Sequence, residues 1–298
     1  MGIRIVPEIL YSTFVDAVTK DREQVSTDLE QITTGQSVNS LSDNPIAAAA
    51  LVQNLGEASS VDQFTRSISS IQGSLQTADS ALNSVVSSLT QAISLGTEGA
   101  SSTLTPGERQ TLAAQVNDLQ QGILGLANTT YQGDYVFAGT AVNAQPYVAD
   151  SSSPSGVSYE GNSNANNVQV GEAQFVPANL PGSTIFNGTG ADVFQALHDL
   201  SSALQNSGDV AGATTEVEHA LNNVDLQRTF YGATLDRLSN ASYTLSQEQI
   251  DLSQQQNSLV GADLPTSATN LAQAETTLNA ALAAFGQISQ NNLLNYLK

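Results

Sequence analysis

Histidine, cysteine and carboxylate side chains are the groups that most often bind metals or transfer protons in proteins. The chain has 298 residues and no cysteine. Its two histidines, His198 and His219, lie far apart in the sequence and therefore do not form an H-E-x-x-H motif. We therefore predict no metal site, and a solvated or helix-capping role for both histidines.

Motifs that bind phosphates or activate a serine nucleophile are also missing. The segment Asn187-Gly188-Thr189-Gly190 contains G-x-G but lacks the third glycine of a dinucleotide-binding loop, and the lysine of a P-loop is absent. No G-x-S-x-G element occurs. The segment is better explained as a turn before a helix that starts at Asp192. We predict that the protein is not an enzyme and carries no cofactor.

Charge and hydropathy exclude two further classes of partner. Eight Lys and Arg against 28 Asp and Glu give a net charge of −20, which repels nucleic-acid phosphates. No stretch approaches the roughly 18 consecutive apolar residues that a membrane-spanning helix needs. Residues 1–20 lack the continuous apolar core of a cleavable secretory signal. We expect no nucleic acid and no membrane as partners, and secretion without a cleaved signal peptide.

Heptad repeats are the main structural pattern of the sequence. From Leu264 onward, apolar side chains recur every seven residues, with a second row beside them. The two rows are Leu264, Leu271, Leu278 and Phe285, and Ala274, Ala281 and Ile288. A seven-residue repeat is typical of a helix that packs lengthwise against another helix.

The N-terminal segment predicts a second amphipathic helix, from Glu8 to Thr34. Its apolar residues follow three-four spacing at Tyr11, Phe14, Val18, Val25 and Ile32. Asp21 and Asp28 interrupt this stripe, so the helix is poorly equipped to hold a partner alone. Asp21 and Asp28 would then prevent this helix from pairing tightly before it meets its final partners.

Longer heptad helices lie between these two in the sequence. Gly35 is expected to end the N-terminal helix in left-handed geometry, and Asn44 to cap a helix that begins at Pro45. The seam of that helix is Val61, Phe64, Ile68, Ile71, Leu75, Ala78, Leu82, Val85, Leu89 and Ala92. Thr105 marks the start of another helix. The last inner helix repeats Val217, Val224, Tyr231, Leu238, Leu245, Leu252 and Leu259, and Arg228 weakens its companion row.

Between Tyr131 and Gly190 the pattern changes to short extended pieces separated by Gly, Asn, Ser and Pro, which predicts a small β-rich module. The predicted fold class is mainly α. It is a long antiparallel coiled-coil or helical bundle with both termini paired, plus a small β-rich inserted domain. Because the two terminal stripes are thin, we expect other subunits to be their final partners.

Three segments resemble one protein family. They are Arg4-Ile5 with residues 29–49 (LEQITTGQSVNSLSDNPIAAA), residues 131–140 (YQGDYVFAGT) and residues 278–297 (LNAALAAFGQISQNNLLNYL). The first resembles the amino-terminal signature of bacterial flagellins, and all three are similar to hook-associated relatives of the flagellins. The low lysine content, and Asn44 where the family commonly has a second Asp, depart from the family pattern.

The resemblance implies a flagellin-like architecture. Its parts would be a terminal coiled-coil domain D0 (residues 1–42 with 263–298), a helical domain D1 (43–138 with 191–262) and a β-rich domain D2 (139–190). It also implies a structural subunit at the junction between hook and filament of the bacterial flagellum. That subunit would be extracellular and exported by the flagellar type III apparatus.

The partners that the resemblance implies are all proteins of the flagellar system. They are like subunits in a ring, the hook protein or a hook-side junction protein, filament flagellin or a second junction protein, and an export chaperone. The residues expected at the subunit interface are Phe14, Val18, Val25, Ile32, Leu264, Leu271, Leu278, Phe285 and Ile288.

Two alternative functions remain. One is a filament flagellin, against which Pro45 and the segment Phe137-Ala138-Gly139-Thr140 argue. The other is a secreted coiled-coil adhesin or needle-tip protein. Both would share the helical pattern but not the place at the junction.

Overall fold

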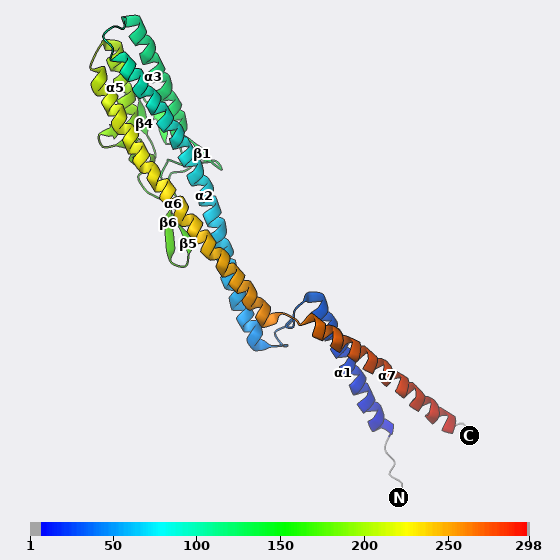
Figure 1. The fold of residues 1–298 in the computed structure, drawn as a ribbon. Helices are drawn as coiled ribbons and strands as arrows, with labels where there is room; N and C mark the ends of the chain where they lie inside the picture. Colours follow the sequence, from blue (N-terminus) through cyan, green and yellow to red (C-terminus); the bar gives the residue numbers. More distant parts are fainter. Residues whose placement is uncertain (1–6, 297–298) are drawn as a thin grey trace. The chain divides into compact units, whose positions relative to one another are not determined.

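A computed structural model describes the backbone from Pro7 to Tyr296 and the side chains from Tyr11 to Gln287 (Figure 1). The chain forms two compact units. The first contains both ends of the chain, up to Ser60 and from Glu248, and the second is Val61–Gln247. The finer division into D0, D1 and D2 stays a prediction.

Helices make up most of the described residues, which confirms the mainly α fold class. The helices are α1 (Pro7–Thr34), α2 (Pro45–Gly99), α3 (Pro106–Ala127), α4 (Gly182–Ile185), α5 (Val193–Asn206), α6 (Val210–Val260) and α7 (Leu264–Tyr296). The strands are β1 (Thr130–Tyr131), β2 (Asp134–Tyr135), β3 (Tyr147–Ala149), β4 (Val157–Tyr159), β5 (Asn167–Gly171), β6 (Gln174–Pro177), β7 (Asn187–Gly188) and β8 (Ala191–Asp192).

Local sequence signals set the helix boundaries. The Thr105 hydroxyl accepts a hydrogen bond from the Glu108 N–H at 3.3 Å, and the Glu108 carboxylate accepts one from the Thr105 N–H at 2.7 Å, which is a capping box. The Asn44 side chain accepts from the Ala47 N–H at 3.1 Å, which confirms the predicted cap of α2. Gly35 has a φ of +70° directly after α1, which confirms the predicted left-handed end of that helix.

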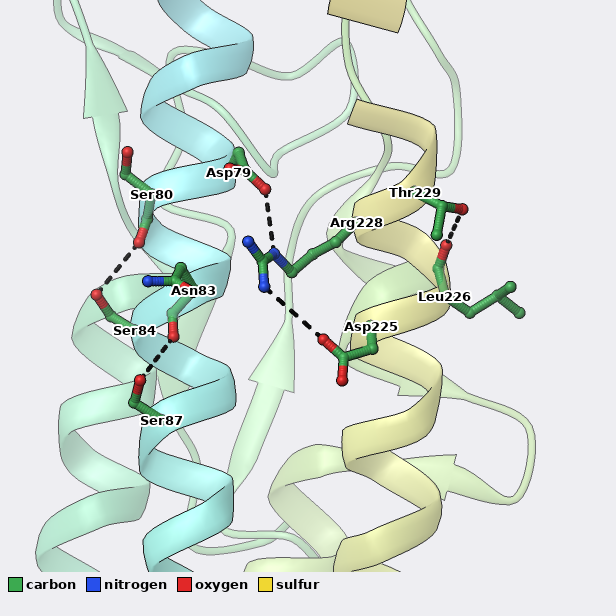
Figure 2. Close-up of polar contacts among 9 residues, drawn as sticks. All are labelled: Asp79, Ser80, Asn83, Ser84, Ser87, Asp225, Leu226, Arg228 and Thr229. Atoms are coloured by element: carbon green, nitrogen blue, oxygen red, sulfur yellow. Dashed lines mark hydrogen bonds and ion pairs between the residues drawn. The ribbon is translucent and has the colours of Figure 1, made fainter. Parts of the chain in front are cut away.

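The core of the second unit contains the predicted heptad seams. The seam residues of α2 from Ile68 to Ala92 are all buried, as are Val224 and Tyr231 of α6. Arg228, which interrupts the α6 pattern, points toward α2, and its Nε lies 3.1 Å from Asp79 Oδ1 (Figure 2). A charged residue is tolerated there because it pairs across the two helices and keeps partial contact with solvent.

The β-rich module lies between α3 and α5. In the described part of the chain its strands form separate antiparallel pairs, β1–β2, β3–β4, β5–β6 and β7–β8, rather than one sheet. The predicted turn at residues 187–190 is the β7–β8 hairpin, after which Asp192 caps α5 by accepting from the Gln195 N–H at 2.8 Å.

A cluster of aromatic rings forms the core under these hairpins. The ring of Tyr147 lies 5.4 Å from that of Phe186 and 5.2 Å from that of Phe194, measured between centroids. The Tyr147 hydroxyl donates to Asn187 Oδ1 at 2.8 Å. Burial raises the pKa of the Tyr147 phenol above its ordinary value, so its hydroxyl remains a hydrogen-bond donor.

Candidate assembly interface

Helices α1 and α7 pack side by side in the first unit (Figure 1). Near the chain ends, the rings of Phe14 and Phe285 stack with centroids 4.1 Å apart. At the opposite end of the pair, the Ser267 hydroxyl donates to Gln31 Oε1 at 3.0 Å. These contacts define an antiparallel hairpin and confirm the predicted pairing of the two terminal segments.

The predicted interface residues lie along this hairpin, but its two helices cover them incompletely. The side chains that are half-buried are Phe14, Val18, Val25, Ile32, Leu271, Leu278 and Phe285. Leu264, in the first turn of α7, is 46% exposed. The side chain of Ile288 lies outside the described residues. Part of the apolar stripe therefore remains accessible in a single chain, and its place at a subunit interface stays a prediction.

The most buried described side chain of α1 is a carboxylate. Asp28 is 2% exposed. Its Oδ1 accepts from Gln24 Nε2 at 3.0 Å, whereas Oδ2 is buried and has no hydrogen-bond partner among the described residues. Because burial of an incompletely paired polar group costs free energy, Asp28 weakens the closed hairpin.

No cation of α7 balances this carboxylate. From Leu264 to Tyr296 the sequence has a single charged residue, Glu275. Asp21 lies one heptad before Asp28 on the same row of α1 and is half-buried. The structure thus confirms that acids interrupt the α1 stripe at positions that face the pair.

The two loops at the base of the hairpin bind each other through their backbones. The Ser37 N–H donates to the Val260 carbonyl at 2.7 Å, and the Ala262 N–H donates to the Gly35 carbonyl at 2.9 Å. Gln36 and Gly261 form an antiparallel bridge between these bonds. The sequence predicted the end of α1 at Gly35 but not the pairing of the two loops, because backbone hydrogen bonds do not depend on side-chain type.

A carboxylate orders the loop between α1 and α2. Asp43 accepts hydrogen bonds from the Ser40 N–H at 2.8 Å, the Ser40 hydroxyl at 2.9 Å and the Asn39 N–H at 3.0 Å. These bonds, first of all that from the Ser40 backbone, hold the pKa of the Asp43 carboxyl below its usual range. The loop is therefore a defined connection with the carboxylate ionised.

Sequence reasoning missed part of the packing in this unit. Ser267 is 5% exposed, although serine gave no apolar signal; its position one heptad before Ala274 was the available clue. A small core under the loops was also missed. It consists of Val38, Ala47, Ala48 and Val260, with Leu51 and Leu259 packed against it.

Large apolar side chains near this small core are exposed. Leu41 in the loop is 75% exposed, Ile46 in the first turn of α2 is 84% exposed, and Val52 is 68% exposed. Together with the half-covered hairpin they make the first unit rich in uncovered apolar surface, which is typical of a protein interaction site.

The described residues offer no metal site and no membrane-spanning helix. Among the described residues, no group of three or more His, Asp or Glu side chains is placed to hold a metal ion, and no helix is long and apolar enough to cross a membrane. His198 and His219 are both exposed. A shallow groove of about 600 Å³ in the second unit is lined by uncharged residues such as Gly73, Ser80 and Tyr131.

A helical protein whose terminal helices pair, yet cover their apolar stripes incompletely, has the features of a subunit that assembles with other chains. The chain belongs to the bacterial flagellin family. Residues 8–142 match the bacterial flagellin N-terminal helical region, and residues 214–297 match the bacterial flagellin C-terminal helical region. Residues 143–213, which contain β3 to α5, lie outside both matches.

Known relatives along the whole chain include two proteins named flagellar hook-associated protein 3. That of Escherichia coli (strain K12) is 23% identical, over 99% of this chain and 100% of its own length. That of Salmonella typhimurium is 26% identical, over 95% of this chain and 96% of its own. A solved structure of a putative flagellar hook-associated protein from Vibrio parahaemolyticus covers 74% of this chain and 100% of its own, with a TM-score of 0.68 at 21% identity. The structural likeness supports the flagellin-like fold.

Proposed function

We propose that this chain is the structural subunit that joins hook to filament in a bacterial flagellum. The observation that carries the proposal is the α1–α7 hairpin, whose apolar seam is incompletely covered within one chain. Its similarity to proteins named flagellar hook-associated protein 3 along nearly all of their lengths favours the junction among the places in the flagellum.

The mechanism is mechanical rather than catalytic. Neighbouring subunits cover the half-buried side chains of the hairpin, chiefly Phe14, Leu271 and Phe285, as the ring forms. Burial of apolar area stabilises such contacts by about 25 cal/mol per Å², and a ring repeats each contact at every subunit. The part of the β-rich module from β3 onward, which lies outside the family matches, is free to vary without disturbing the hairpin.

The partners follow from this position. They are like subunits in a ring, the hook protein or a hook-side junction protein, and filament flagellin or a second junction protein. An export chaperone holds the chain before assembly. The protein is extracellular, leaves the cell through the flagellar export apparatus, and is not an enzyme.

Deletion of the gene in the source bacterium tests this proposal. We expect intact hooks without filaments, filament subunits released into the medium, and no swimming. The native gene on a plasmid should restore filaments and swimming. Normal swimming of the deletion strain would contradict the proposed function.

A filament flagellin is the second candidate, because the matching family models describe flagellin regions. The two candidates differ in self-assembly. A filament flagellin should polymerise into long filaments after purification, whereas a junction subunit should not. Electron microscopy of the purified chain separates the two.

A further inference from the structure

The α1–α7 hairpin has two sides that differ in size and charge. In an antiparallel pair of heptad helices, the positions beside the seam rows form two flanks, one on each side of the seam. We define the large flank as Val15, Arg22 and Leu29 of α1 with Ala268, Glu275 and Leu282 of α7. We define the small flank as Ala17, Gln24 and Gln31 of α1 with Asn270, Thr277 and Ala284 of α7.

The large flank presents uncovered apolar side chains. Val15 is 40% exposed, Leu29 is 53% exposed and Leu282 is 43% exposed. Arg22 and Glu275 lie between them and are also exposed. Among the described residues these two form no ion pair within 4 Å, so both charges are available to a neighbour.

The small flank is its counterpart in size and charge. It contains no charged residue, although the chain as a whole has a net charge of −20. Along the axis of the hairpin, its two alanines, Ala17 and Ala284, lie at the same height as Val15 and Leu282 of the large flank. Gln24 and Thr277 lie at the level of the charged residues Arg22 and Glu275.

The outward face of α1 restricts where a second copy can approach. Asp16, Glu23 and Glu30 follow one another at seven-residue spacing on this face, and all three are exposed. A like chain that approached this row would meet it with its own excess of carboxylates, and like charges repel. On α1, a contact with the same chain is therefore more favourable at the flanks than on the outward face.

From these observations we infer that the large flank of one copy packs against the small flank of the next copy. The inference rests on the proposed function and specifies its contact between like subunits. A closed ring of identical chains requires two different surfaces that complement each other, and the two flanks of one hairpin meet this requirement. Val15 and Leu282 fill the space above the alanines, while Arg22 and Glu275 meet neutral amide and hydroxyl groups instead of carboxylates.

Cysteine cross-linking in assembled flagella tests the contact, because the chain has no cysteine of its own. One chain carries Glu275→Cys on the large flank, and a second carries Thr277→Cys on the small flank. Both are produced together in the deletion strain, and isolated hook–filament structures are oxidised. We expect a dimer of about twice 31.0 kDa, several-fold stronger than with either chain alone.

A matched control uses the residue between the two. Thr276→Cys, on the outward face of α7, should give no dimer with Thr277→Cys above the level of the single chains. The pair Leu282→Cys and Ala284→Cys repeats the test one heptad further along, in case substitution at Glu275 disturbs folding. The Thr276→Cys chain should support swimming by itself.

Three results would overturn the inference. They are a strong dimer with Glu275→Cys alone, an adduct with a protein of different mass, and absence of a dimer from both pairs in flagella that contain the chain. Absence of the chain from the flagella would instead refute the proposed function. In that case the two cysteine variants are purified, mixed and oxidised in solution. A dimer then supports the flank contact, and absence of a dimer overturns the flank contact.

Discussion

Two charged residues at seam positions show how side chains set the strength of a helix pair. Arg228 of α6 lies 3.1 Å from Asp79 and keeps partial exposure, so its charge is satisfied. Asp28 of α1 is 2% exposed, and one of its oxygens has no partner among the described residues. The inner seam is therefore stable in one chain, whereas the terminal seam carries a cost that assembly must offset.

Replacement of Asp28 by leucine should stabilise the hairpin. The change removes an incompletely satisfied buried carboxylate, whose burial costs about 1–3 kcal/mol, and adds apolar contact with α7. We expect slower amide exchange in α1 and α7 of the purified variant than in the native chain. Hydrogen exchange followed by mass spectrometry measures this difference.

The matched control for this variant is Asp16→Leu. Asp16 is exposed on the outward face of the same helix. Its replacement should therefore change the opening free energy of α1, as measured by amide exchange, by no more than about 0.5 kcal/mol. Faster exchange in the Asp28→Leu variant than in the native chain would show that Asp28 stabilises the hairpin, against our account.

At the scale of elements, glycines reveal where helices approach closely. A Cβ at Gly96 of α2 would collide with the Thr214 hydroxyl and lie 3.2 Å from Leu200 Cδ1. Thr214 and Leu200 are both buried, so neither side chain can move aside freely. Gly122 of α3 has no neighbouring atom within 4 Å of its added Cβ. Packing therefore requires a glycine at position 96 but not at position 122.

Substitution of these two glycines by alanine should change stability in opposite directions. Gly96→Ala forces overpacking, which costs about 1–3 kcal/mol. Gly122→Ala gains up to about 1 kcal/mol of helix propensity. Thermal unfolding followed by circular dichroism should show a lower Tm for the first variant and a higher Tm for the second. An equal or higher Tm for Gly96→Ala would contradict the close contact among α2, α5 and α6.

The terminal helices should be the least protected elements of the isolated chain. None of the described apolar seam residues of α1 is fully buried. By contrast, every seam residue of α2 from Ile68 to Ala92 is buried. Local stability follows the density of buried apolar contacts. We expect amide protons of α1 and α7 to exchange much faster than those of α2 and α3. Equal protection in all four helices of the monomer would refute this expectation.

Sequence periodicity predicted the helical elements well because seam spacing is a direct consequence of helix geometry. The α2 seam, the cap at Asn44 and the left-handed Gly35 all depend on residues close together in the chain. The burial of Ser267 and the unsatisfied oxygen of Asp28 depend instead on where the opposite helix lies. Periodicity identified Asp28 as a seam position, but only the paired structure reveals its missing hydrogen bond.

The β-rich module was predictable as a composition change but not as a topology. Gly, Asn, Ser and Pro signalled short strands and turns between Tyr131 and Gly190. The strand pairings and the packing of Tyr147 on Phe186 and Phe194 join residues far apart in the sequence. No local pattern specifies such contacts, since register depends on tertiary packing.

At the scale of the whole molecule, folding and assembly depend on different parts of the chain. The second unit has its own buried core, whereas the hairpin leaves its apolar stripe for other chains to cover. Removal of α7, in a chain that ends at Asp263, should leave the Tm of the second unit unchanged. The same chain should fail to restore filaments to the deletion strain.

Two observations check this truncation. Circular dichroism reports the thermal transition of the purified truncated chain, and electron microscopy reports filaments in the complemented strain. Restored filaments would show that α7 is dispensable for assembly. A lost thermal transition would show that the second unit needs α7 to fold, which its separate core argues against.

The most direct test of the central claim is an image of the assembled flagellum at a resolution that shows helices. We predict that density for this chain is confined to the distal end of the hook. Its α1–α7 hairpins should pack against one another as a ring in the wall of the axial structure. Density for the chain all along the filament, or a junction without it, would contradict the account.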